Sequence, residues 1–116
     1  MLSHSLENGV LVLTVDDDPG PEAEENALAV LIRDLVHVHA PTPVVVVLSA
    51  EAGPVVIDAV VDAHRMCGEL DVLMSVAAPS APARRALQTR TAAHGGGLVV
   101  HARADTAITT AYSTAA

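Results

Sequence analysis

Short apolar runs alternate along the chain with longer stretches of helical spacing. Residues 1–6 and Val10–Val15 form two apolar-rich runs on either side of Asn8-Gly9. Asn-Gly at such a position predicts a β-hairpin, because both residues tolerate a positive φ. The second run, VLVLTV, is almost entirely apolar, which is typical of a strand that is covered on both faces.

Three later runs, at residues 44–50, 72–77 and 98–103, are rich in aliphatic residues and predict buried strands. A stretch with helical spacing precedes each of them. The first helix is expected to begin near Pro21, whose fixed φ suits a first helical position, and to stop before Pro41. Its apolar stripe is expected to comprise Ala27, Leu28, Leu31, Leu35 and Val38.

The second helix is expected to begin near Pro54 and to end just before Gly68, because glycine is the residue type that most often follows a helix end. Its two sides differ in polarity at three- and four-residue spacing. The side expected to be buried carries Val56, Ile57, Val60, His64 and Cys67. The side expected to face solvent carries Asp58, Asp62, Arg65 and Glu69.

A third helix is predicted over residues 82–94 with Ser80 as its cap, and Asp105 is expected to cap a fourth. Arg84 and Arg85 stand where the helix dipole disfavours positive charge, so they are candidates for contact with a partner or with an acid within the chain, although a solvated face is the default interpretation. The order β-β-α-β-α-β-α-β-α predicts an α/β fold. We expect residues 1–116 to form one domain with a single mixed sheet, largely parallel after its opening hairpin, and about four helices.

The charge and composition of the chain limit the kinds of partner it can bind and the compartment in which it can act. The formal net charge is −8 and all six basic residues are arginine, which disfavours nucleic acids and anionic membranes as partners. The absence of Phe and Trp removes the platforms on which single-stranded bases stack. Cys67 is the only cysteine, so no internal disulfide can form and a cytoplasmic location is predicted. The longest apolar stretch, residues 27–38, contains Arg33 and Asp34, so no membrane span is expected.

Residues that could carry chemistry do not form a convincing reactive group. His37 and His39 are two residues apart and would point to different sides of a helix, so they predict no metal site. His64 and Cys67 lie three residues apart but lack an accompanying oxyanion-hole motif. We therefore predict no cofactor, no metal site and no enzymatic activity.

Four segments together resemble the STAS domain, the fold of bacterial anti-sigma factor antagonists. They are VLVLTV with the acidic helix start that follows, PVVVVLS, VLMSVAAPSAPARRAL and GGGLVVHARADTAITTA. Their order and spacing cover nearly the whole chain. The resemblance implies a STAS-like fold and a regulatory protein that binds an anti-sigma factor resembling a serine kinase.

The family's phosphoacceptor sequence, Asp-Ser-Ser/Thr-Gly, is missing. The family serine would fall near Ala52, just before Gly53, and the nearest hydroxyl belongs to Ser49. Ser49 is interpreted either as a polar strand end or as a displaced phosphorylation site. Glu51 is either an ordinary acidic residue near a helix start or a fixed charge that mimics a phosphate.

The resemblance also implies a partner-binding surface on the turn and on the helix after it. Its candidate residues are Ser49, Glu51, Ala52, Gly53, Pro54, Asp58, Asp62 and Arg65. Two alternatives stay open. One is a small-ligand or nucleotide sensor that uses the carboxyl ends of the strands. The other is a self-associating module, such as a homodimer within a signalling complex.

Overall fold

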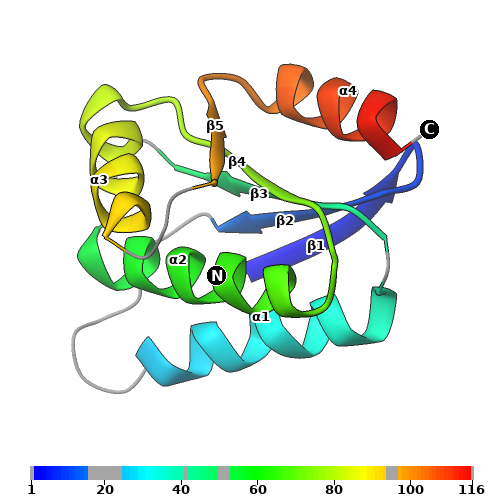
Figure 1. The fold of residues 1–116 in the computed structure, drawn as a ribbon, viewed down its shortest axis with the longest axis horizontal. Coiled ribbons are helices and arrows are strands. Elements are labelled where there is room, and N and C mark those ends of the chain that lie inside the picture. Colours follow the sequence, from blue (N-terminus) through cyan, green and yellow to red (C-terminus); the bar gives the residue numbers. More distant parts are fainter. Residues whose placement is uncertain (1, 16–24, 41, 50–52, 94–96, 116) are drawn as a thin grey trace.

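A computed structural model describes residues 2–15, 25–40, 42–49, 53–93 and 97–115 of the chain. Strands and helices follow one another in the predicted order (Figure 1). They are β1 (Leu2–Glu7), β2 (Val10–Val15), α1 (Glu25–His39), β3 (Val44–Leu48), α2 (Pro54–Glu69), β4 (Met74–Ala77), α3 (Ala81–Ala92), β5 (Val99–His101) and α4 (Ala104–Ala115). The predicted α/β class is confirmed.

The five strands form one sheet in the order β1-β2-β3-β4-β5. β1 pairs with β2 antiparallel, and the remaining neighbours are parallel, as predicted. The opening hairpin turns at Asn8 and Gly9, whose φ angles are 53° and 75°. Positive φ at both positions matches the twist of the flanking strands, so the Asn-Gly prediction is confirmed.

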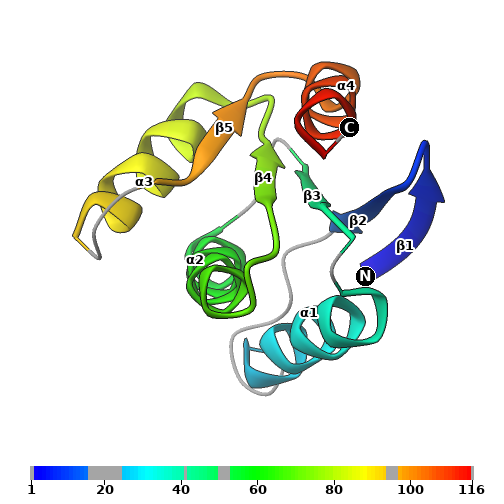
Figure 2. The same cartoon turned by 45° about the vertical axis from the view of Figure 1, so that its right-hand side comes forward.

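The helices cover the two faces of the sheet unequally. α1, α2 and α3 lie on one face and α4 lies on the other (Figures 1 and 2). Right-handed crossovers between successive parallel neighbours bring all connecting helices to the same face. α4 follows the last strand, so no crossover constrains it, and it returns over the opposite face. It packs there against Val10, Val12, Val45 and Ala77.

The predicted apolar stripe of α1 is wrong at two positions. Leu31 is 50% exposed and Val38 is 77% exposed, whereas Ile32 and Val36 are buried together with Leu28. Almost every face of α1 carries aliphatic residues, so spacing alone does not identify the buried one. The position of the sheet decides it.

The predicted end of α2 is also wrong. Gly68 lies within the helix, which continues to Glu69, and Asp71 adopts the left-handed φ of 57° instead. The N–H of Val72 donates to the Cys67 carbonyl at 2.9 Å, and the N–H of Asp71 donates to the Gly68 carbonyl at 3.4 Å. These two bonds form a Schellman motif. The motif occupies Val72, so β4 begins at Met74 rather than at residue 72.

The caps of the last two helices give one confirmed prediction and one correction. The Ser80 hydroxyl accepts a hydrogen bond from the Ala83 N–H at 3.4 Å, so Ser80 caps α3 as predicted. Asp105 lies inside the first turn of α4, and the Ala107 N–H donates to the Arg103 carbonyl at the helix start. The Asp105 carboxylate accepts from the Thr106 N–H, and mainly for this reason its pKa is lowered.

Candidate functional site

The turn between β3 and α2 was the first part of the predicted partner surface. Ser49 is partly exposed directly after β3, while Glu51 and Ala52 lie outside the described residues. Gly53 has an extended φ of −98° and offers no side-chain cap, and Pro54 opens the helix. The Gly53 carbonyl accepts the first helical hydrogen bond, from the Ile57 N–H at 3.0 Å. The start of α2 at Pro54 is therefore set by Gly53 and Pro54.

Two ion pairs organise the polar side of α2. Asp58 pairs with Arg90 of α3 and is 42% exposed, so it joins the two helices. Asp62 and Arg65 pair with each other at 3.4 Å, and both side chains are 63% exposed. The predicted binding residues thus divide into one that is engaged within the fold and two that remain accessible.

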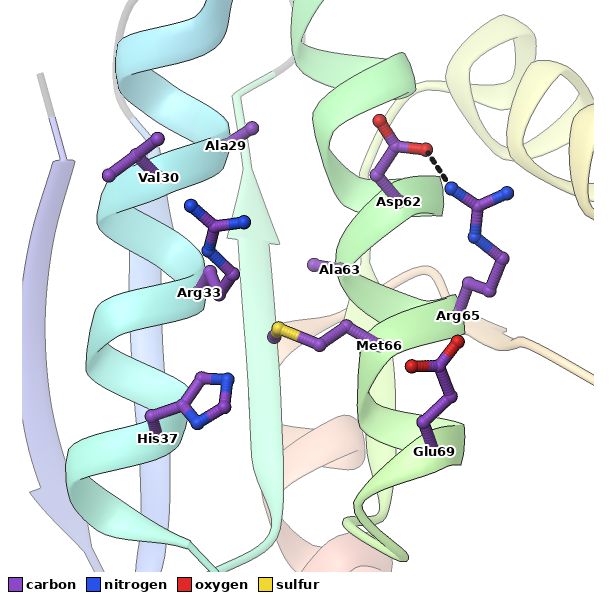
Figure 3. A pocket seen from close by; sticks show the side chains of 9 residues that line it. All are labelled: Ala29, Val30, Arg33, His37, Asp62, Ala63, Arg65, Met66 and Glu69. Carbon is purple, nitrogen blue, oxygen red and sulfur yellow. Dashed lines mark hydrogen bonds and ion pairs between the residues drawn. The ribbon is translucent and has the colours of Figure 1, made fainter.

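A groove of about 580 Å³ runs between α1 and α2 (Figure 3). Its lining comprises Ala29, Val30, Arg33, His37, Asp62, Ala63, Arg65, Met66 and Glu69. Arg33, His37 and Met66 project into the space between the helices, while Asp62 and Arg65 meet on the far side of α2. The short side chains of Ala29 and Ala63 leave this space unfilled. The groove therefore presents the guanidinium of Arg33 and the imidazole of His37 on the α1 side, and the carboxylates of α2 lie at its outer rim.

The contribution of α1 to this groove was missed at the level of sequence. Arg33 and His37 are four residues apart and share one flank of the predicted helix, which was the available signal. Nothing local to α1 indicates that this flank faces α2. His39 lies elsewhere, with its ring centroid 6.2 Å from that of His4. The two histidines of α1 therefore lie on different surfaces.

Within the chain, Arg84 contacts backbone carbonyls rather than an acid. Its guanidinium Nη1 donates to the carbonyls of Ala78 at 2.9 Å and Pro79 at 3.0 Å. These bonds tie the start of α3 to the end of β4. Arg85 is exposed on α3.

The histidine and cysteine of α2 differ in burial, since His64 is only partly buried. Cys67 is fully buried, and this desolvation raises the pKa of its thiol to about 11. Burial also lowers the pKa of His64, whose ring lies beside Gly97. A thiol with this pKa is almost entirely protonated at neutral pH and is a poor nucleophile. Cys67 therefore acts as a small apolar side chain of the core.

Within the described ranges, no three His, Cys, Asp or Glu side chains are grouped closely enough to hold a metal ion. No helix in the same ranges combines the length and the apolar character that crossing a bilayer requires. Comparison of the chain with protein-family models and with curated proteins found no match.

Proposed function

We propose that the chain is a regulatory protein–protein interaction domain that resembles anti-sigma factor antagonists and binds an anti-sigma factor resembling a serine kinase. The observation that carries the proposal is the exposed Asp62–Arg65 pair beside the α1–α2 groove. The STAS-like order of strands and helices supports the same function. Such a partner implies that the protein acts in the cytoplasm.

The accessible charges of α2 suit reversible binding. An exposed ion pair contributes at most about 1 kcal/mol, so a partner can replace the Asp62–Arg65 contact at little cost. The net charge of −8 steers association toward a basic surface. In the floor of the groove, the flexible thioether of Met66 can adapt to an inserted side chain.

The residues of the proposed surface differ in role. Asp62 and Arg65 contact the partner, and the turn through Ser49, Gly53 and Pro54 forms the adjoining edge. Asp58 lies at the boundary, because Arg90 already holds its carboxylate. Ser49 remains the candidate phosphoacceptor, because it is partly exposed and immediately precedes the turn into α2.

Binding of the purified chain to candidate anti-sigma kinases tests the proposal. Asp62→Arg should weaken the complex by about tenfold or more, since it places a cation against a basic partner surface. Asp105→Arg is the matched control, because its carboxylate is exposed and ion-paired on the opposite face of the sheet. Equal loss in both variants would contradict the proposed surface. Failure of every candidate kinase to bind the wild type would contradict the function.

Phosphopeptide mapping after incubation with a bound kinase tests the role of Ser49. Phosphate on Ser49 of the wild type, and none on Ser49→Ala, would establish a displaced switch. A complex that forms without any modification of Ser49 would show that this domain binds without the serine switch.

The groove also supports a second candidate function, the sensing of a small anionic ligand. Its volume of about 580 Å³ lies within the usual range of small-molecule sites, roughly 300–1,000 Å³. Arg33 and His37 project into it and can contact phosphate oxygens. Thermal shifts with nucleotides and inorganic phosphate, lost in Arg33→Ala, would favour this function over partner binding.

A further inference from the structure

Among the residues that the structure describes, no strand lies beside the outer edge of β1. β1 stands at the end of the sheet order, and its pairing with β2 runs unbroken from Leu2↔Val15 to Glu7↔Val10. Its sequence, LSHSLE, contains no Lys, Arg or Pro and has one acidic residue, Glu7, at its end, and the unbroken register contains no bulge. Lys, Pro and bulges are features that commonly protect an edge strand from pairing with another chain. β5, the opposite edge, has only three residues.

The face of β1 toward α1 is partly apolar and uncovered. Leu6 pairs with Leu11, a member of the core on the side of α1, so Leu6 points to that side. Nevertheless Leu6 is 58% exposed. His4 pairs with Leu13 and therefore shares this face, and its ring lies near that of His39. β1 and the end of α1 thus form a continuous surface.

α1 extends this surface along the flank that faces away from α2. Ala29, Arg33 and His37 line the groove toward α2, whereas Leu31 and Val38 lie on the other side of the helix axis. Figure 2 shows α2 and β1 on opposite sides of α1. Leu31 is 50% exposed and Val38 is 77% exposed. We define the β1–α1 surface by His4, Leu6, Leu31, Val38 and His39.

We propose that the β1–α1 surface is a two-fold interface at which two copies of the chain pair β1 with β1 in antiparallel orientation. A second copy supplies an identical unpaired edge, so one contact satisfies the backbone groups of both strands. The two-fold axis of an antiparallel strand pair is perpendicular to the sheet and keeps both α1 helices on the same face. Leu31 and Val38 of each α1 then face the other copy's helix across the axis.

Charge limits how closely two copies of the chain can approach. Two chains with a net charge of −8 repel each other over most of their surfaces. The five residues of the β1–α1 surface include no carboxylate, but β1 also carries Glu7 and α1 also carries Asp34, both exposed, so added salt should strengthen the pairing. The α1–α2 groove lies on the other flank of α1, so this pairing leaves it open in each copy.

Sedimentation velocity of the full chain over a range of concentrations tests the interface. The wild type should be a dimer that dissociates on dilution. Leu6→Lys and Val38→Lys should each raise the dissociation constant by about tenfold or more, because each places a charge in a desolvated interface. Val99→Lys is the matched control, since Val99 is 51% exposed on the opposite edge strand. Far-UV circular dichroism confirms that each variant is folded.

Cysteine cross-linking provides a second measurement that does not depend on the lysine variants. Ser5→Cys places a thiol in β1 and should form an interchain disulfide under mild oxidation, because β1 strands adjoin in the dimer. Ser113→Cys, exposed on α4, should not. A monomer at every concentration, a dimer that only Val99→Lys weakens, or a dimer without the Ser5→Cys cross-link would each overturn the proposal. In the first case, an extended peptide of another protein becomes the candidate for the β1 edge.

Discussion

The two faces of the sheet are covered by helices of different composition. On the face of α1, α2 and α3, the core contains large aliphatic side chains such as Ile32, Val60 and Leu87, all fully buried. On the other face, α4 contributes Ala107 and Ala111 to the core. Short alanine side chains bring a helix close to a sheet but bury little apolar area for each residue. The three-helix face should therefore supply most of the hydrophobic stabilisation.

This asymmetry also places both proposed surfaces on the same layer. In the three-helix layer, one flank of α1 faces α2 and its other flank faces away from α2. Its flank toward α2 lines the charged groove, and its other flank carries the exposed apolar residues Leu31 and Val38. On the opposite face, α4 has no neighbour among the helices that the structure describes, so it forms no such groove there.

The largest expected effect comes from removing a core side chain on each face. Ile32→Ala should lower the free energy of unfolding by about 2–5 kcal/mol, because Ile32 is fully buried between α1 and the sheet. Ile108→Ala, a partly buried residue of α4, should cost less than about 2 kcal/mol, since less apolar area is lost. Urea denaturation measures both. Equal costs would contradict the proposed difference between the faces.

Enlarging a buried alanine tests how closely α4 approaches the sheet. Ala107 is fully buried, so Ala107→Leu should lower the free energy of unfolding by about 1–3 kcal/mol through overpacking. Thr109→Leu, at an exposed position of the same helix, should change it by no more than about 0.5 kcal/mol. A neutral Ala107→Leu would show that α4 packs loosely enough to admit a larger side chain.

Improving helix propensity in each layer tests whether both layers unfold together. Gly68 lies inside α2 with open space around it, so Gly68→Ala should raise the free energy of unfolding by about 0.5–1 kcal/mol. Thr109→Ala in α4 should raise it by up to about 0.7 kcal/mol. Both gains should appear in one cooperative thermal transition. A gain from Gly68→Ala without one from Thr109→Ala would indicate that α4 unfolds before the rest.

The smallest effect concerns His64 on the three-helix side. Its pKa is lowered from 6.5 by burial, so the unfolded state binds its proton more readily than the folded state does. The contribution of neutral His64 to stability is therefore complete above pH 6.5 and declines as pH falls below that value. The wild type should lose more stability than His64→Gln between pH 7.5 and 5.5, measured by urea denaturation in each buffer. Parallel pH profiles would contradict the prediction.

The fold was largely predictable because its strongest signals are local. Asn8-Gly9 specifies its own turn through positive φ, and Ser80 caps α3 with an atom three residues from its donor. The end of α2 shows where local signals compete. Gly68 was the better residue for a helix end, but apolar side chains on both sides of the Schellman motif, Cys67 and Val72, are buried and place that end after Glu69.

The candidate site was only partly predictable, because several of its contacts join different helices. Asp62 and Arg65 could be assigned to the exposed side of α2 from spacing within one helix. The pairing of Asp58 with Arg90, and the placement of Arg33 and His37 across a groove from α2, involve side chains from different helices. The periodicity of one helix does not determine how a neighbouring helix is rotated about its own axis.

The sequence by itself determined the order of strands and helices, the hairpin and the acidic, lysine-free character of the chain, because each depends on residue types or on neighbours a few positions apart. The tertiary structure alone decided which flank of α1 faces α2, which apolar residues stay exposed, and which carboxylate of α2 is held by α3. These outcomes depend on how helices from distant parts of the chain pack on a common sheet. Contacts between those elements outweigh the local preferences of the sequence.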